Sequence, residues 1–227
     1  MDCWICGALA ETSEHMIKVS DLRDLFGHTT TKKPLYRRIN KGLQEKIQGV
    51  RSAKLKFNAQ LCGNCNNTRT QPHDKSWEAL AKFLRERSPA IKPGEVIRAR
   101  SAFKNGLRPG LLGVHLYFIK LFGCQILDGK VPIDTQPLAK AILNNVAHPH
   151  VYLTFLAITN RKFKRQAFVT PIETISINGN LSGAQWFYFV GRIGIHVIYA
   201  PAIHMRSEKV HLWHPSFTTK TLTLDGW

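Results

Sequence analysis

The sequence predicts an α+β protein in which a zinc-stapled N-terminal unit precedes an α+β domain with an antiparallel sheet. Three observations predict this arrangement. Two Cys-x-x-Cys pairs lie near the N-terminus, apolar residues recur at helical spacing in the middle of the chain, and segments rich in β-branched and aromatic residues follow His150. Pro89, Pro93 and Gly94 interrupt the chain between the N-terminal unit and the α+β domain. We therefore expect two domains, residues 1–87 and residues 88–227.

The first of these observations concerns Cys3 and Cys6, and Cys62 and Cys65. Each Cys-x-x-Cys turn holds two sulfurs close enough to share one ion at about 2.3 Å per bond. Two such turns supply the four thiolates that tetrahedral Zn²⁺ requires. A redox-active dithiol would need a βαβ setting, which this region lacks. The cysteines therefore predict a structural Zn²⁺ site.

The beginning of the chain and its most apolar stretch bear on location. The residues after Met1 leave no room for a secretory signal. His115, Lys120 and Gln125 interrupt the apolar stretch 111–127, so we expect that it does not span a bilayer. We expect a cytoplasmic, intracellular protein with no membrane partner, and in that compartment paired cysteines more often hold metal than form disulfides.

The helices are predicted from the spacing of apolar residues. Trp77, Leu80, Ala81 and Leu84 recur at helical steps and predict an amphipathic helix over 74–87. Two more helices and four strands follow. The helices are expected at 111–128, which is apolar on all sides, and at 136–147. The strands are expected at 151–158, 166–172, 186–190 and 195–200, with the last two joined as a hairpin by a glycine-containing turn.

The charge of the chain is strongly positive. Thirty-two Lys and Arg against 15 Asp and Glu give a formal net charge of +17. This sign attracts polyanions, of which nucleic acid is the commonest, so we expect DNA as the partner and RNA less so. Much of the charge lies in a basic insert, residues 30–60, whose alternative interpretation is a solvated loop. The residues expected to contact phosphates are Lys32, Lys33, Arg37, Arg38, Lys41, Arg51, Lys54 and Arg69.

Polar residues beside the cysteine pairs have the chemistry of phosphodiester hydrolysis. Such cleavage needs an activated water and a cation that neutralises charge on the phosphate. A neutral imidazole can accept the proton of that water. Carboxylate and amide oxygens suit Mg²⁺ or Mn²⁺. The residues that supply these groups are Glu14, His15, Asn58, Asn66, Asn67, His73 and Asp74.

The order Cys-x-x-Cys, Glu14-His15, Asn58-Ala-Gln-Leu, Cys-x-x-Cys, Asn66-Asn67 resembles the zinc-containing HNH endonucleases, over residues 1–87 only. The resemblance implies a ββα-metal fold, with a β-hairpin bearing Glu14-His15, a helix beginning near Asn66, and one catalytic Mg²⁺ or Mn²⁺ between them. It implies that His15 is the general base of a DNA endonuclease. It further implies that Glu14 and Asn66 bind the catalytic metal and that Asn58 steadies the loop around the base.

The chain departs from the family pattern in three ways. Asn66 in place of His gives an HNN pattern, which the family tolerates, Asn58 lies one residue closer to Cys62 than expected, and the basic insert is long. His73 or Asp74 could therefore supply a metal ligand instead, although both could simply begin a helix.

Other interpretations remain open at this stage. Asn66 and Asn67 could serve as helix caps and nothing more, and Asn58 could be a turn residue. A non-catalytic zinc-ribbon protein that binds nucleic acid would also explain the cysteines and the charge. For residues 88–227, target recognition, partner docking and homodimerisation are equally compatible with the sequence.

Overall fold

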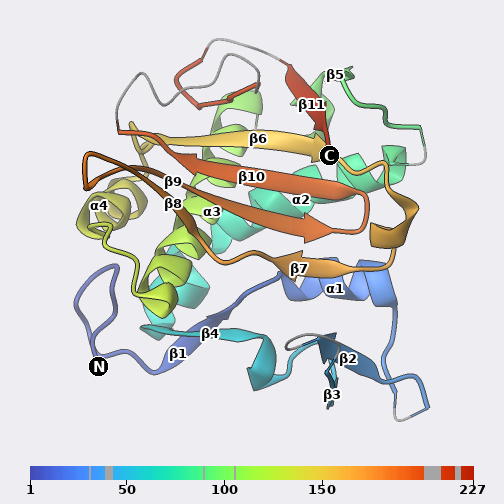
Figure 1. The fold of residues 1–227 in the computed structure, drawn as a ribbon, viewed down its shortest axis with the longest axis horizontal. Coiled ribbons are helices and arrows are strands. Elements are labelled where there is room, and N and C mark those ends of the chain that lie inside the picture. The colour runs from blue at the N-terminus through green and yellow to red at the C-terminus, as the bar shows by residue number, and fades with distance from the viewer. Residues whose placement is uncertain (31, 39–42, 89, 105, 202–210, 218–220) are drawn as a thin grey trace.

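The computed structural model describes residues 1–30, 32–38, 43–88, 90–104, 106–201, 211–217 and 221–227. A seven-stranded sheet forms one layer of the molecule. Helices α2 (Gln71–Arg87) and α3 (Leu107–Gly129) lie against one face of this sheet (Figure 1). The N-terminal strands β1 (Thr12–His15) and β4 (Lys56–Leu61) form a separate pair, which lies below the edge of the main sheet formed by β7 (Ala167–Val169) in the view of Figure 1. The predicted α+β class is confirmed.

The main sheet is mostly, but not wholly, antiparallel. Its order is β5-β11-β6-β10-β9-β7, and β8 pairs with β9. Among the described strands the one parallel pair is β11 with β6, so the expectation of an antiparallel sheet is correct for the other pairs of this sheet. The bounds are β5 (Val96–Ile97), β6 (Val151–Ala157), β7 (Ala167–Val169), β8 (Glu173–Ile177), β9 (Asn180–Val190), β10 (Ile193–Tyr199) and β11 (Leu222–Gly226).

The hairpin predicted from the glycine-containing turn is formed by β9 and β10. Val190 pairs with Ile193, so Gly191 and Arg192 alone make the turn. Gly191 has a φ of 63°, a left-handed conformation that glycine adopts without strain. The tight turn sets the register that buries Trp186 and Val197 on the sheet face covered by the helices.

Helix α3 is the central helix of the core. By length and composition alone it could cross a membrane, but 83% of its most apolar window is buried inside the protein. Two glycines permit its close neighbours: a Cβ at Gly113 would lie 2.3 Å from Ser76 Oγ on α2, and one at Gly123 would lie 2.4 Å from the ring of Trp4. The apolar pattern that predicted this helix therefore reflects burial on all sides within the protein.

The other predicted helices are confirmed with shifted ends. The amphipathic helix is α2, and its apolar face buries Trp77, Leu80 and Leu84 as expected. The third helix, α4 (Gln136–Asn144), ends earlier than predicted because Asn145 adopts a left-handed cap.

Several elements were not predicted. Helix α1 (Val19–Phe26) precedes the basic insert, and the insert contains a hairpin of β2 (Leu35–Arg38) and β3 (Gln44–Ile47). The strands β5, β8 and β11 were also missed. Each of these elements is short or largely exposed, so it carries little periodic apolar signal.

A buried carboxylate connects the N-terminal half to the sheet. Asp21 of α1 is fully buried and accepts hydrogen bonds from Trp77 Nε1 (2.8 Å), Arg85 Nη1 (2.7 Å) and the hydroxyl of Tyr188 on β9 (2.6 Å). The buried apolar residues around it form one continuous cluster drawn from both halves of the chain. The division after residue 87 stays a prediction.

Candidate metal centre and histidine site

The four predicted cysteines form one cluster. Their sulfur atoms all lie within 4.8 Å of one another, and Cys6 Sγ is 3.5 Å from Cys62 Sγ. Tetrahedral Zn²⁺ with bonds of about 2.3 Å places its sulfurs about 3.8 Å apart, so this donor set fits the ion. Burial and the neighbouring thiols raise the pKa of Cys65, which a bound cation would counteract. The cluster could therefore hold a structural metal such as zinc.

Local structure brings the two cysteine pairs together. The N–H of Gly7 donates to the carbonyl of Cys3 at 2.8 Å, and Gly7 has a φ of 73°, which closes the first turn tightly. The second pair follows β4 directly and enters the π-helix Asn64–Arg69 that precedes α2. A bound ion would thus fasten the N-terminal turn to the junction of β4 and the helices.

Strand β1 carries Glu14 and His15 into the protein beside β4. Thr12 pairs with Leu61 and His15 with Lys56, with an irregularity between Ser13 and His15. The structure thus has two antiparallel strands followed by a helix in this part of the chain. No second group of at least three His, Cys, Asp or Glu side chains gathers like the cysteines within the part of the chain that the structure describes.

Glu14 points into the protein and pairs with a buried lysine. The ammonium group of Lys120 on α3 is fully buried and forms ion pairs with Glu14 and with Asp74 Oδ1 (2.9 Å). It also donates to Thr70 Oγ1 at 3.1 Å, and Lys18 Nζ lies 3.1 Å from Asp74 Oδ2. The second carboxylate oxygen of Glu14 accepts the backbone N–H of His15 at 2.8 Å.

Glu14 and Lys120 each stabilise the charged form of the other. Burial acts to raise the pKa of Glu14, but the charge and the hydrogen bond of Lys120 outweigh it and keep that pKa below its usual value. Burial acts to lower the pKa of Lys120, but Glu14 and Asp74 raise it overall. Glu14 and Lys120 are therefore both charged at neutral pH.

His15 stands at the end of β1. Its Nε2 is buried and has no hydrogen-bond partner among the described residues. Burial is the main cause that lowers the pKa of His15, and the charges of Lys56 and Lys18 add to it against the opposing effect of Glu14. The imidazole is therefore neutral at pH 7 and able to accept a proton.

The other predicted site residues have partners elsewhere. The backbone N–H of Asn58 donates to Asp128 Oδ2 at 2.8 Å, and the side chain of Asn66 donates to Thr12 Oγ1 at 3.2 Å. His73 is buried, and its Nε2 lies 3.2 Å from Asn145 Oδ1 at the end of α4. Among the described residues, none of these three side chains has a hydrogen bond to Glu14 or Lys120. Their catalytic and metal-binding roles stay predictions.

Sequence reasoning did not identify Lys120, Lys18 or Thr70 as site residues. Lys120 was only noted as an interruption of an apolar stretch. A lysine within a helix that is apolar on all sides needs buried carboxylates as partners, and this requirement was the available signal.

The β2–β3 hairpin separates the predicted phosphate contacts into two faces. Arg37 Nη1 donates to the carbonyl of Lys54 at 2.6 Å, and Lys54 forms an ion pair with Glu45. Both basic side chains therefore already have partners within the protein. Tyr36 and Lys46 pair across the strands and both are exposed, as is Arg38.

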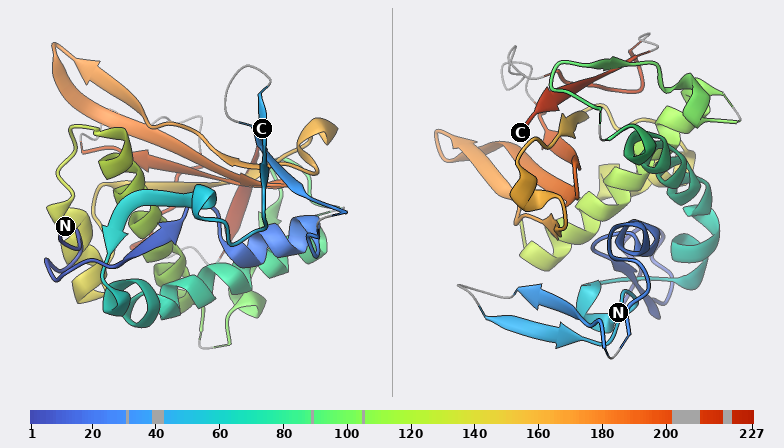
Figure 2. Two further views of the ribbon diagram at one scale, coloured as in Figure 1. Left: turned by 90° about the horizontal axis from the view of Figure 1, so that it is seen from below. Right: turned by 90° about the vertical axis from the view of Figure 1, so that its right-hand side faces the viewer.

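The remaining predicted contacts are mostly at the surface. Lys32, Lys33 and Arg51 are exposed and Arg69 is half-buried, whereas Lys41 lies outside the described residues. The hairpin pairs only with itself and extends away from the main sheet (Figure 2).

No protein-family model matches the chain, and neither the curated proteins nor the solved structures contain a match.

Proposed function

We propose that this protein is an endonuclease that hydrolyses phosphodiester bonds of DNA, with His15 as the general base. The observation that carries the proposal is the state of that imidazole. It is neutral at pH 7, and its buried Nε2 is without a partner among the described residues. A buried polar atom without a partner is rare, and catalytic hydrogen bonds often form only when substrate is bound.

The surroundings of His15 suit a phosphate. Lys56 and Lys18 both act on its pKa, so positive charge lies near the imidazole. In the proposed reaction Nε2 accepts a proton from water, and the resulting hydroxide attacks phosphorus. The bond between phosphorus and O3′ breaks and O3′ takes up a proton from water, giving 5′-phosphate and 3′-hydroxyl ends. The hydrogen bond between the N–H of His15 and Glu14 fixes the backbone at this position.

A catalytic Mg²⁺ or Mn²⁺, as the family resemblance implies, would need free oxygen ligands beside His15. Glu14 adjoins His15 and Asp74 belongs to the same network, and both are held in ion pairs, Glu14 with Lys120 and Asp74 with Lys120 and Lys18. In this arrangement the two carboxylates do not fit a divalent ion. The cysteine cluster fits Zn²⁺, whose role there would be structural because all four positions are protein thiolates.

The Lys120 ion pairs favour a second candidate, a zinc-stapled protein that binds nucleic acid without cutting it. In that case the Glu14 network would serve only to connect β1, α2 and α3. The net charge of +17 and the exposed basic face of the hairpin support both candidates equally.

A plasmid-cleavage assay distinguishes the two. Purified protein is incubated with supercoiled plasmid in Mg²⁺, in Mn²⁺ and without added divalent ion, and its zinc content is measured in each sample. His15→Ala is compared with His28→Ala, which removes an exposed histidine. In at least one of these three conditions we expect cleavage by the wild type and by His28→Ala, and in none of them cleavage by His15→Ala. Binding with no cleavage in any condition would favour the second candidate.

A further inference from the structure

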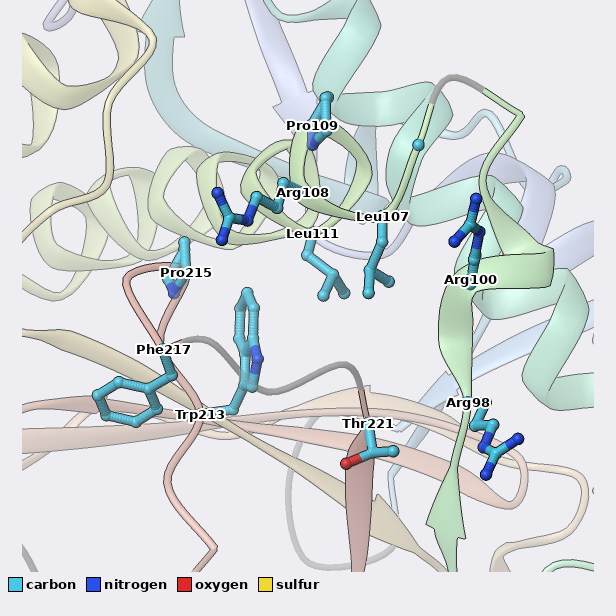
Figure 3. Close-up of a pocket in the computed structure, with 11 residues that line it drawn as sticks. Arg98, Arg100, Leu107, Arg108, Pro109, Leu111, Trp213, Pro215, Phe217 and Thr221 are labelled. Carbon is cyan, nitrogen blue, oxygen red and sulfur yellow. The ribbon is translucent and has the colours of Figure 1, made fainter.

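A pocket opens beside the first turn of α3 (Figure 3). Its volume is about 740 Å³, within the range of about 300–1,000 Å³ that is usual for small-molecule sites. Leu107 and Leu111 of α3, Trp213 and Phe217 line it, and in the view of Figure 3 the two leucines lie on one side of the Trp213 ring and Phe217 on the other. The pocket therefore offers flat apolar surface to a ligand.

Three arginines from different elements surround this space. Arg98 follows β5, Arg100 lies in the short 3₁₀ helix Ala99–Ala102, and Arg108 lies in the first turn of α3. Figure 3 shows Arg98 and Arg100 on one side of the pocket and Arg108 on the other. All three are exposed, and among the described residues none pairs with a carboxylate. No acidic side chain is found among the described residues that line the pocket, so its rim is strongly positive.

Two further features point to a missing partner. Trp213 is only 6% exposed, and its buried Nε1 has no acceptor among the described residues. Figure 3 shows this nitrogen on the side of the ring that faces Leu107 and Thr221. The N-terminal end of α3 lies at the same place without a side-chain cap or an acidic residue in its first turn, so its positive pole is not neutralised.

We propose that this pocket binds a nucleotide unit, with the phosphate at the arginine rim and the base against Trp213 and Phe217. Guanidinium groups bind phosphate oxygens through paired hydrogen bonds, and aromatic side chains stack on bases. An acceptor oxygen of the sugar or phosphate would supply a partner for the indole N–H, which lies in the plane of the ring and is not reached by a base stacked on its face. Inorganic phosphate alone would leave the apolar surface unused.

The pocket is separate from the histidine site, so the proposal does not rest on nuclease activity. Leu107 and Lys120 lie on the same helix, and at a rise of about 1.5 Å per residue they are about 20 Å apart. The nucleotide could be free or part of a strand. A neighbouring hollow shares Arg108 with the pocket and is lined by Lys75 and Lys104, so we expect a strand to bind more tightly than a free nucleotide.

Binding to the full-length protein tests the proposal. The ligands are dAMP, a short 5′-phosphorylated single-stranded oligonucleotide and inorganic phosphate, titrated without added divalent ions. The variants are Arg98→Ala, Arg108→Ala and Phe217→Ala, all at exposed positions, with Arg165→Ala as an exposed arginine outside the pocket. Each arginine removed from the rim is expected to weaken nucleotide binding about tenfold, as loss of a charge-assisted hydrogen bond would.

We expect Phe217→Ala to weaken binding of dAMP but not of phosphate, and Arg165→Ala to change neither. If only the oligonucleotide binds and the rim variants weaken it, the proposal holds with a strand as the source of the nucleotide. If phosphate binds as tightly as dAMP, or if the rim variants bind like the wild type, the proposal is wrong.

Discussion

The fully buried ammonium group of Lys120 on α3 forms an ion pair with Glu14 of β1, although the two residues lie far apart in the sequence. Asp74 of α2 completes the arrangement, so one ammonium group joins three elements around the residue proposed as the general base. Breaking a buried pair by removing one partner is costly, because the remaining charge is left without compensation.

Replacing Lys120 should therefore destabilise the protein strongly. We expect Lys120→Met to lower the free energy of unfolding by about 3–5 kcal/mol, since Glu14 would stay buried without its ion-pair partner. Urea denaturation measures the change, and Lys140→Met at an exposed position is the control. Adding Glu14→Gln to Lys120→Met should restore part of the loss. A loss no larger than that of Lys140→Met would contradict the importance of this network.

The cysteine cluster predicts the metal content of the purified protein. We expect one Zn²⁺ per chain in the wild type and none in Cys62→Ser, because a serine hydroxyl does not replace a thiolate ligand. Cys124→Ser is the matched control, since Cys124 is buried in α3 outside the cluster. Elemental analysis after gel filtration measures the zinc. Full zinc retention by Cys62→Ser would show that the ion is held elsewhere.

The exposed basic face of the β2–β3 hairpin, which carries Arg38 and Lys46, should contribute to binding of nucleic acid. Removing two phosphate-binding cations with Arg38→Ala and Lys46→Ala should reduce the slope of log affinity against log salt concentration by about 2. The charge-matched control is Lys140→Ala with Arg165→Ala. Fluorescence anisotropy with labelled duplex DNA measures the slope. Equal slopes for the two double variants would mean that the hairpin acts only through the net charge.

Acid should destabilise the protein through buried histidines. Burial, reinforced by His150 and His214, lowers the pKa of His148 to about 4, and burial lowers that of His196 to about 4 against the opposing effect of Asp225. Both histidines are neutral in the folded protein but take up protons in the unfolded chain below an ordinary pKa of about 6.5. The free energy of unfolding should therefore fall as the pH drops from about 6.5 to about 4.

Urea midpoints across this pH range measure the effect. His196→Gln should flatten the pH dependence, because glutamine does not titrate, whereas His28→Gln at an exposed position should not change it. A wild-type stability that stays constant or rises toward pH 4 would contradict this assignment.

Local patterns in the sequence were sufficient for part of the fold and of the site. The cysteine pairs predicted their cluster because both the spacing and the ligand chemistry are local to each turn. The helical spacing of Trp77, Leu80 and Leu84 predicted α2 for the same kind of reason.

Long-range relationships could not be predicted in this way. Nothing local to Glu14 indicates Lys120 as its partner, and nothing local to β11 indicates parallel pairing with β6. The sequence also gave no sign that Arg37 and Lys54 have partners within the protein whereas Arg38 is exposed.

The pH dependence of DNA cleavage by the wild type and by His15→Ala, at equal zinc content, tests the proposed role of His15 most directly. If His15 is the general base, wild-type cleavage should fall on the acidic side with an apparent pKa below the ordinary histidine value, because burial lowers that pKa. The variant should show no cleavage above background at any pH. Cleavage by His15→Ala with the same rate and the same acidic limb as the wild type would contradict the proposal.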